Sequence, residues 1–187
     1  MRDRLSVVVT VSERLARFRV PLGWALGISL LVFARPTPAL LALGAAVSAL
    51  GESMRLWASG HLEKNRTLTT SGPYAWTRNP LYLGSFVVGV GFCIASGRPA
   101  FLVLLLVLFL GVYLPVMRRE AERLEASFSD EYRSYSSRVP LFLPGLRGPE
   151  PHGGARFSWA RVLQNREHQA IAGLLLVVAI LAGKLAV

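Results

Sequence analysis

Apolar blocks, separated by short stretches rich in proline, glycine and arginine, constrain this chain more than any other feature. The blocks cover residues 20–34, 39–58, 81–96, 100–117 and 169–187. A helix needs about 20 apolar residues to cross the hydrocarbon core of a bilayer, so these blocks are long enough or nearly so. In lipid each segment must satisfy its own backbone hydrogen bonds, and a helix does this. The pattern predicts an all-α polytopic membrane protein with about five transmembrane helices.

The breaks between blocks and the composition agree with this prediction. Arg35-Pro36-Thr37-Pro38 separates the first two blocks and predicts a tight helical hairpin, and Gly97-Arg98-Pro99 separates the third and fourth. Only 17% of residues are charged, below the roughly 25% of soluble domains. The length of 187 residues suggests one domain. We therefore expect residues 1–187 to form a single domain, whose motif-bearing core is 60–145.

The net charge of +10 comes from 21 basic and 11 acidic residues. The basic residues flank the apolar blocks, which indicates a membrane surface and not nucleic acid as the partner. They gather before the first block, between the second and third, and between the fourth and fifth. Because Lys/Arg-rich loops stay cytoplasmic, this predicts a cytosolic N-terminus and an outer C-terminus. The expected location is the inner membrane of a bacterium. The first residues are interpreted as a cytosolic lead-in without a cleavable signal.

Several residue types give no catalytic or metal-binding pattern. The sole cysteine, Cys93, cannot form a disulfide framework, and the three histidines have no metal-ligand spacing, so no metal site is predicted. Glu52 lies inside the second block, where an acidic residue is a functional candidate. It can pair with Arg55, and we expect a structural role.

The first candidate site lies before and at the start of the third block, in residues 65–84. Pro80 can occupy the first turn of a helix, where its missing N–H costs nothing. The free N–H groups there, beside Arg78, would attract an anion. Tyr74, Trp76 and Tyr82 add aromatic faces that could stack on a base. The same residues could also form an aromatic belt anchored by an arginine at the membrane interface.

The second candidate site is the charged segment 118–125, which follows the fourth block. A solvated helix with local ion pairs is one interpretation. However, this segment leaves the membrane on the side where the third block begins, so the two segments can converge. Further along, Leu124, Phe128, Tyr132 and Tyr135 recur at spacings that predict a single helical face.

Taken in this order, the two segments resemble the isoprenylcysteine carboxyl methyltransferase family and its phospholipid methyltransferase relatives. The likeness runs from about 65 to 144 and is carried by Arg66-Thr67-Leu68, Gly72-Pro73-Tyr74, Arg78-Asn79-Pro80-Leu81-Tyr82, Glu120, Leu124, Phe128, Tyr132, Tyr135 and Pro140. The resemblance implies a multi-span fold that binds S-adenosylmethionine in a cytosolic pocket capped by the C-terminal segment. It also implies a lipid substrate that enters sideways from the bilayer.

The resemblance further implies which residues hold the cofactor: Arg66, Thr67, Leu68, Thr69, Tyr74, Asn79, Pro80, Leu81, Tyr82 and Glu120. Glu120 and Arg78 are the candidate catalytic residues. The implied activity is methyl transfer to a lipid or isoprenoid-bearing acceptor, with a carboxylate as the favoured acceptor group. An amine acceptor would need a base, for which Glu120 is the nearest candidate.

Three positions depart from the family pattern. Asn79 replaces a histidine; asparagine can hydrogen-bond but cannot titrate near neutral pH, so a proton-transfer role is not carried over. Ala121 stands where the family has a second glutamate. Val116 stands where the eukaryotic enzymes have an arginine, so the role of binding a substrate carboxylate at that position is not carried over either. Arg118 or Arg119 is the candidate to bind the carboxylate in its place.

Two other functions are compatible with parts of the pattern. An NADPH-dependent sterol-type membrane reductase resembles this family near the Arg78–Tyr82 segment. A non-enzymatic membrane scaffold would tolerate loss of Tyr82 and Glu120. The segment from Glu120 to Leu124 favours the methyltransferase, and measuring the binding of both cofactors separates these alternatives.

Overall fold

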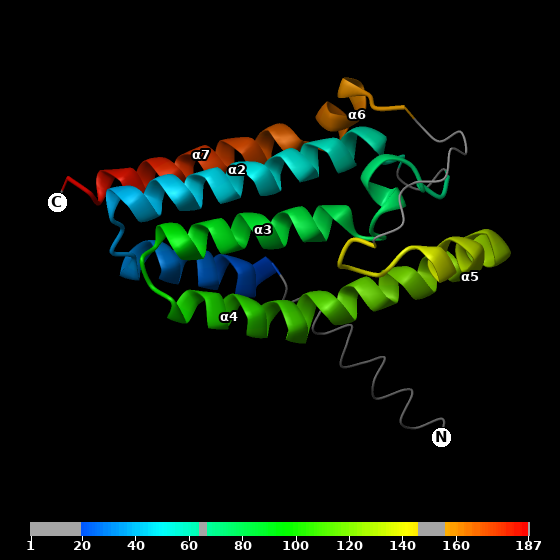
Figure 1. Ribbon diagram of the computed structural model, residues 1–187, viewed down its shortest axis with the longest axis horizontal. Helices are drawn as coiled ribbons and strands as arrows, with labels where there is room; N and C mark the ends of the chain where they lie inside the picture. Colours follow the sequence, from blue (N-terminus) through cyan, green and yellow to red (C-terminus); the bar gives the residue numbers. More distant parts are fainter. Residues whose placement is uncertain (1–19, 64–66, 146–155, 187) are drawn as a thin grey trace, which may run out of the picture.

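The computed structural model describes residues 20–63, 67–145 and 156–186. Within these ranges every regular element is a helix, which confirms the all-α prediction. The long helices lie side by side along the longest axis of the molecule (Figure 1). They are Val20–Phe33, α2 (Pro38–His61), α3 (Pro80–Ala95), α4 (Ala100–Leu108) with its continuation, and α7 (Glu167–Gly183). The short η1 (Gly72–Ala75) and α6 (Trp159–Gln164) lie together at one end of this bundle.

Each predicted apolar block forms a helix close to its expected bounds. Two helices, Pro38–His61 and the continuous Ala100–Arg138, are long and apolar enough to cross a membrane. The three others, Val20–Phe33, Pro80–Ala95 and Glu167–Gly183, are apolar but shorter. The positions of the five helices are therefore confirmed, while five crossings stay a prediction.

The helix that begins at α4 continues well beyond its apolar block. After α4 the chain passes through one π-helical segment, η2 (Phe109–Tyr113), into α5 (Leu114–Arg138). Pro115 has no N–H to donate to the carbonyl four residues earlier, and its ring would clash with that carbonyl, so the wider turn accommodates it. The helix predicted to follow Met117 is thus present, and it carries the charged segment 118–125 away from the apolar region.

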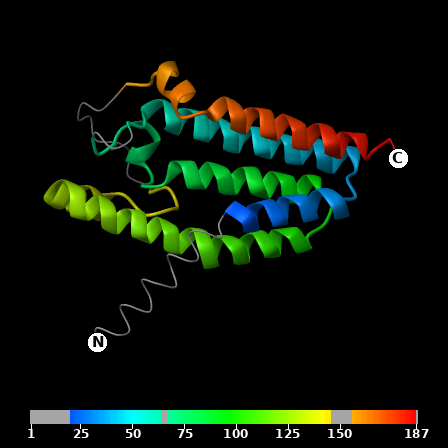
Figure 2. The ribbon, with the colours of Figure 1, turned by 180° about the vertical axis from the view of Figure 1, so that it is seen from behind.

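A kink at Ser129 divides α5. Ser129 has φ 42° and ψ −113°, outside the helical region and on the side of φ that non-glycine residues rarely adopt. After it the chain turns back toward the start of α3 (Figures 1 and 2). The predicted continuous face through Leu124, Phe128, Tyr132 and Tyr135 is therefore wrong, because the helix changes direction in the middle of it.

Glycines let α2 and α3 approach until their backbones are in contact. A Cβ on Gly51 would lie 2.7 Å from the carbonyl oxygen of Gly84. Gly44 and Gly91 are similarly crowded, each against the backbone of the other helix. Contacts between small residues of this kind are the usual way helices pack tightly in membranes. This seam sets the position of α3 and, with it, the residues at the start of α3.

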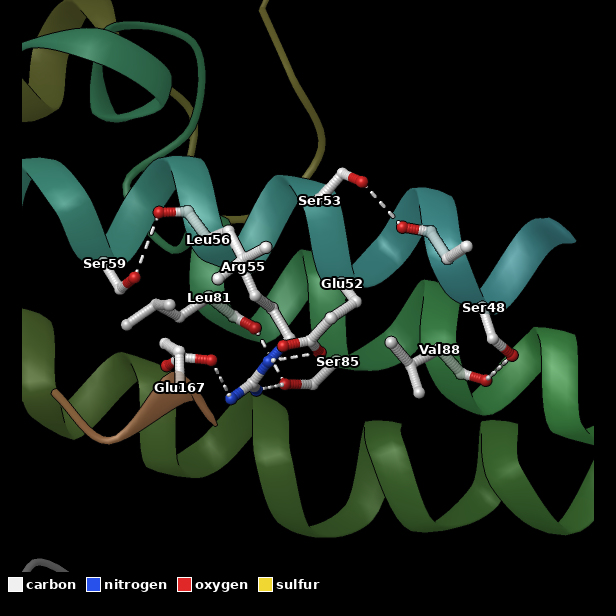
Figure 3. Close-up of polar contacts among 11 residues, drawn as sticks. Ser48, Glu52, Ser53, Arg55, Leu56, Ser59, Leu81, Ser85, Val88 and Glu167 are labelled. Atoms are coloured by element: carbon white, nitrogen blue, oxygen red, sulfur yellow. Dashed lines mark hydrogen bonds and ion pairs between the residues drawn. The ribbon is translucent and has the colours of Figure 1, made fainter. Parts of the chain in front are cut away.

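A buried charged cluster joins α2, α3 and α7 (Figure 3). Arg55 forms ion pairs with Glu52, with Nε–Oε2 at 3.2 Å, and with Glu167, with Nη2–Oε2 at 2.8 Å. It also donates to the hydroxyl of Ser85 on α3. The predicted Glu52–Arg55 pair is confirmed. The pairing with Glu167, 112 residues away from Arg55 in sequence, attaches the C-terminal helix to the rest of the bundle.

Candidate functional site

A cavity of about 570 Å³ lies where the start of α3 meets α5, and we call it the polar cavity. Its volume falls within the range typical of small-molecule sites. The lining residues come from the segment after α2, from η1 and the start of α3, and from both halves of α5: Leu62, Glu63, Thr67, Leu68, Thr69, Tyr74, Arg78, Asn79, Pro80, Leu81, Tyr82, Glu120, Ala121, Arg123, Leu124, Ser127, Phe128, Tyr132 and Tyr135.

The N-terminus of α3 forms one wall of this cavity. Pro80 is the first residue of the helix, and no side chain caps its first N–H groups. These groups form the positive end of the helix dipole, which favours an anion. The region predicted to attract an anion therefore lies on the cavity wall.

A hydrogen bond joins the two segments that were predicted to converge. The hydroxyl of Tyr82, in the first turn of α3, donates to Oε1 of Glu120 on α5 at 2.8 Å. Both side chains line the polar cavity. The convergence is thus confirmed.

Arg78 presents a donor that the protein leaves unsatisfied. Its Nη1 donates to the Tyr132 hydroxyl at 3.1 Å, and its Cζ lies 5.9 Å from the centre of the Tyr132 ring. Its Nε is buried and has no hydrogen-bond partner among the residues that the structure describes. Arg78 itself lines the polar cavity, so its guanidinium places a positive charge on the wall that favours an acceptor such as a carboxylate.

Two buried tyrosines form another wall. The Tyr135 hydroxyl donates to the backbone carbonyl of Tyr74 at 2.7 Å. Burial raises the pKa of both phenols above the usual value, because it disfavours the phenolate. Both rings are therefore neutral at physiological pH and provide aromatic faces on which a planar ring could stack.

The segment 139–145 is held against the chain that leads into α3. Arg78 N–H donates to the Pro140 carbonyl at 2.9 Å, and the Asn79 side-chain amide donates to the Leu141 carbonyl at 2.9 Å. Thr77 reaches the Phe142 carbonyl at 2.7 Å. Asn79 thus lines the cavity while its amide is used to hold this segment. Residues 139–145 themselves are not part of the lining, so the predicted capping of the pocket stays a prediction.

The structure brings together nearly all the predicted site residues. Those on the cavity wall are Thr67, Leu68, Thr69, Tyr74, Arg78, Asn79, Pro80, Leu81, Tyr82 and Glu120. Arg66 lies outside the described residues. Trp76 is not part of the lining; its carbonyl accepts a hydrogen bond from Gly145 N–H at 2.8 Å.

Sequence reasoning missed Glu63 and Arg123, which also line the cavity. Arg123 lies three residues after Glu120, and this helical spacing could have placed it on the same face. Glu63 carried no such signal. Its backbone N–H reaches the Thr69 hydroxyl at 3.4 Å, and its carboxylate contacts Arg161 of α6. Arg118 and Arg119 are not among the lining residues.

A second, smaller cavity of about 180 Å³ lies among the helix Val20–Phe33, α3 and the α4–η2 helix, and we call it the apolar groove. Tyr82 lines both cavities. The other residues of the groove are Gly23, Leu26, Gly27, Leu30, Ser85, Phe86, Gly89, Phe92, Cys93, Leu105, Leu108, Phe109 and Tyr113. The polar cavity and the groove therefore meet at one side chain.

Metal-ligating side chains do not gather in the part of the chain that the structure describes. No group of three or more His, Cys, Asp and Glu side chains there could hold a metal ion.

Comparison with known proteins gives consistent matches. The model of the phospholipid methyltransferase family matches residues 25–131, more than half of the chain. The cobalt-zinc-cadmium resistance protein CzcN of Cupriavidus metallidurans is 36% identical over 112 residues, which cover 59% of this chain and 51% of that protein. The protein-S-isoprenylcysteine O-methyltransferase of Mus musculus is 34% identical over 82 residues, 44% of this chain and 29% of that enzyme. The Saccharomyces cerevisiae enzyme of the same name is 30% identical over 82 residues, 44% of this chain and 34% of that enzyme. The chain thus spans about half the length, or less, of these relatives.

Proposed function

This chain belongs to the phospholipid methyltransferase family, and we propose that it is a membrane enzyme that moves a methyl group from S-adenosylmethionine to a lipid or isoprenoid-bearing acceptor. The observation that carries the proposal is the Tyr82–Glu120 hydrogen bond of 2.8 Å. It lies where the polar cavity meets the apolar groove, since Tyr82 lines both. A water-soluble donor and an apolar acceptor could approach each other at this point.

The polar cavity fits the donor in size and in chemistry. Its volume of about 570 Å³ is ample for a ligand of this class. The Arg78 guanidinium on the cavity wall and the start of α3 would hold the carboxylate of the donor. The rings of Tyr74 and Tyr132 would lie against its adenine. Thr67 and Thr69 supply hydroxyl groups for the ribose.

When bound, S-adenosylmethionine supplies a methyl group from its sulfonium: the carbon–sulfur bond breaks with its electrons left on sulfur, while a lone pair of the acceptor forms the new bond. The protein holds the acceptor in line, at near-attack distance, and excludes water. Glu120 is oriented by Tyr82 and would accept a proton from an amine acceptor. A carboxylate acceptor carries no proton to remove and needs no base, so a carboxylate stays the favoured acceptor group.

The eukaryotic carboxyl methyltransferases have an arginine where this chain has Val116. Val116 is buried at 4% exposure and is not among the residues that line the polar cavity. Arg123 lies on that wall together with Glu120. We assign it, in place of Arg118 or Arg119, the role of binding an acidic acceptor group.

The proposal includes the arrangement of the chain in the membrane. The five helices cross the inner membrane of a bacterium, with the N-terminus and the polar cavity on the cytosolic side, and residues 1–187 form one domain. The charge pattern supports this orientation. The related enzymes are named for isoprenylcysteine, which is consistent with an apolar acceptor here.

The direct test measures ligand binding to the purified full-length chain in lipid nanodiscs. We expect calorimetry to detect binding of S-adenosylhomocysteine, the demethylated product, and not of NADPH. Membranes incubated with methyl-labelled S-adenosylmethionine should yield a labelled lipid, identified by mass spectrometry. Absence of S-adenosylhomocysteine binding by folded protein would contradict the proposal.

The Tyr82→Phe variant tests the Tyr82–Glu120 hydrogen bond, since it removes one hydroxyl and keeps the ring. Hydrogen bonds to charged groups contribute about 1.5–3 kcal/mol, so we expect methyl transfer to fall by about 10–100-fold. An unchanged thermal unfolding midpoint would show that the loss is local. A variant as active as the parent would exclude the Tyr82–Glu120 pair from the reaction.

A further inference from the structure

The short helix α6 has two unlike faces. Its inner face packs on the end of α2, where Val162 is buried and Arg161 donates to the Gly60 carbonyl at 3.3 Å. Its outer face is apolar, with Trp159 exposed at 68% and Leu163 at 61%. These two residues are four apart, so they project from the same side of the helix. The described residues of the chain therefore leave an apolar face of α6 open.

Aromatic rings continue this open face onto the end of α2. The ring centre of Phe157 lies 5.0 Å from that of Trp159 and 5.9 Å from that of His61. The ring centre of His61 lies in turn 6.3 Å from that of Trp57, one turn earlier on α2. His61 is buried, whereas the three other rings are exposed. We call the exposed apolar surface made by Trp57, Phe157, Trp159 and Leu163 the aromatic face.

The aromatic face lies at one end of the bundle, next to the start of α7 (Figures 1 and 2). Only Asn165 and Arg166 separate α6 from α7. We take from the proposed function that α7 crosses the membrane, so α6 lies within one turn of the membrane boundary. Tryptophan is enriched at the level of the lipid headgroups, because its ring is apolar and its N–H is polar. The position of the aromatic face thus agrees with its composition.

The charges beside the aromatic face are of one sign. Arg156 and Arg166 flank α6 at its two ends, and both are exposed. Residues 156–166 contain three arginines and no aspartate or glutamate. The next acidic residue, Glu167, is buried and paired with Arg55. An exposed apolar face with basic residues at its edge is attracted to a lipid surface by burial of the rings and, where the lipid is anionic, by charge.

We propose that the aromatic face, together with Arg156 and Arg166, is a docking surface for anionic phospholipids of the adjoining leaflet. Trp159 and Leu163 lie among the upper parts of the acyl chains, and the two arginines bind the phosphate-bearing headgroups. None of these residues lines the polar cavity or the apolar groove, so lipid bound here is not the methyl acceptor. The segment that carries most of this surface lies outside residues 25–131, which match the family model.

The test measures how brominated lipids quench the fluorescence of Trp159 in the full-length chain. Trp24→Phe, Trp57→Phe and Trp76→Phe together leave Trp159 as the only tryptophan. Nanodiscs contain phosphatidylcholine and phosphatidylglycerol in equal amounts, with bromine on the acyl chains of one lipid or the other. Bromine near the headgroup should quench more than bromine near the methyl end. Bromine on phosphatidylglycerol should quench about 3–5-fold more than bromine on phosphatidylcholine, the ratio expected for one arginine at an anionic surface.

Several results of this experiment would overturn the proposal. One is equal quenching by the two brominated lipids. Another is quenching of Trp159 by aqueous acrylamide and by neither lipid, which would place the face in water. Protection from acrylamide and from both lipids would mean that a second copy of this chain covers the face. If the triple variant does not fold, the difference in quenching between the parent chain and Trp159→Phe gives the same measurement, since these two proteins differ in this ring alone.

A pair of double variants tests the role of the two arginines. Arg156→Gln with Arg166→Gln should make quenching by the two lipids equal and leave the depth of Trp159 unchanged, because the rings stay in place. Arg133→Gln with Arg138→Gln is the matched control: it removes the same charge from exposed residues of α5 and should keep the preference for phosphatidylglycerol. The same quenching ratio in the two double variants would overturn the proposal.

These measurements are independent of the methyl-transfer reaction. The nanodiscs contain no methyl donor, so a failure of S-adenosylhomocysteine to bind would overturn the proposed function and leave the quenching result as it stands. Conversely, equal quenching by the two lipids would remove the docking surface and leave donor binding and methyl transfer untouched.

Discussion

Arg78 brings a positive charge to the wall of the polar cavity, next to the start of α3. Its Nη1 donates to the Tyr132 hydroxyl. A carboxylate in the cavity near the start of α3 would be attracted by this guanidinium and would also benefit from the helix dipole. The role assigned to Arg78 therefore concerns one part of the methyl donor S-adenosylmethionine, its amino acid moiety.

This role predicts a difference between two ligands. Arg78→Ala should weaken S-adenosylhomocysteine binding by about 10–100-fold, the loss of one charge-assisted hydrogen-bonding partner. Its effect on 5′-methylthioadenosine should be small, because that molecule lacks the amino acid moiety. Calorimetry with both ligands measures the difference. An equal loss for the two ligands would show that Arg78 maintains the shape of the cavity and does not bind the carboxylate.

Tyr74 and Tyr135 predict how stability depends on alkaline pH. Burial raises the pKa of both phenols in the folded protein above the ordinary value of about 10. Below about pH 10 both states are protonated and the full stability is present. Above it the unfolded chain loses protons first, so the free energy of unfolding should fall as the pH rises.

Tyr135→Phe isolates this effect. It removes one buried phenol and the 2.7 Å hydrogen bond to the Tyr74 carbonyl. At neutral pH the variant should lose about 1 kcal/mol of stability, but its stability should decline less steeply between about pH 9 and about pH 11. Denaturation in mild detergent over this range provides the comparison. Parallel declines for the two proteins would mean that Tyr135 does not titrate on unfolding.

At the scale of the elements, α6 contacts a wall of the polar cavity, although it lies outside the matched residues 25–131. Arg161 of α6 forms an ion pair with Glu63, a residue of the cavity wall. Ser158 N–H donates to the Gly60 carbonyl at 2.9 Å, and the Asn165 amide donates to the Ser59 carbonyl at 3.0 Å. These contacts fasten α6 to the end of α2 and hold the wall that starts there.

Removing the Arg161–Glu63 ion pair should make this wall of the polar cavity less rigid without changing the residues proposed to act in methyl transfer. We expect Arg161→Ala to weaken S-adenosylhomocysteine binding by about 3–10-fold, since the pair is half-buried and its loss removes the Arg161 charge from the Glu63 carboxylate. The reversed pair Glu63→Arg with Arg161→Glu should recover part of that affinity. Arg133→Ala is the control, because its pair with Glu125 is largely exposed and should contribute little. An equal effect of the two alanine variants would contradict the role of α6.

For the molecule as a unit, the number of crossings determines which termini and cavities share a side of the membrane, and the charge pattern determines which side is the cytosol. In the proposed arrangement the segment after α2 lies in the cytosol and the end of α7 lies outside. Thr70 and Leu185 are exposed at these two places, and Cys93 is buried at 5% exposure, so it does not compete for labelling.

Cysteine labelling tests this arrangement. In intact cells a membrane-impermeant maleimide should label Leu185→Cys and leave Thr70→Cys unmodified, and inverted vesicles should give the opposite result. Each variant also serves as the control for the other. Labelling of both from the same side would show an even number of crossings between them, and the proposed orientation would then be wrong.

Local sequence determined the helices and their boundaries. Apolar blocks in lipid can satisfy their backbone only as helices, and proline and glycine end them, so positions such as Pro38 and Pro80 were predictable. The meeting of Tyr82 and Glu120 followed from the same rules, because both segments were predicted to lie at one face of the membrane.

Only the tertiary structure decided the remaining features. The turn at Ser129 uses a conformation that serine rarely adopts, and no pattern signals it. Arg161 and Glu63 are 98 residues apart, and Arg55 and Glu167 are 112 apart. The groove exists because Gly23 and Gly27 face it while Gly44 and Gly51 are pressed against α3. Periodicity reports which face of one helix is apolar, but which glycine meets a backbone and which borders a cavity depends on how several helices pack together.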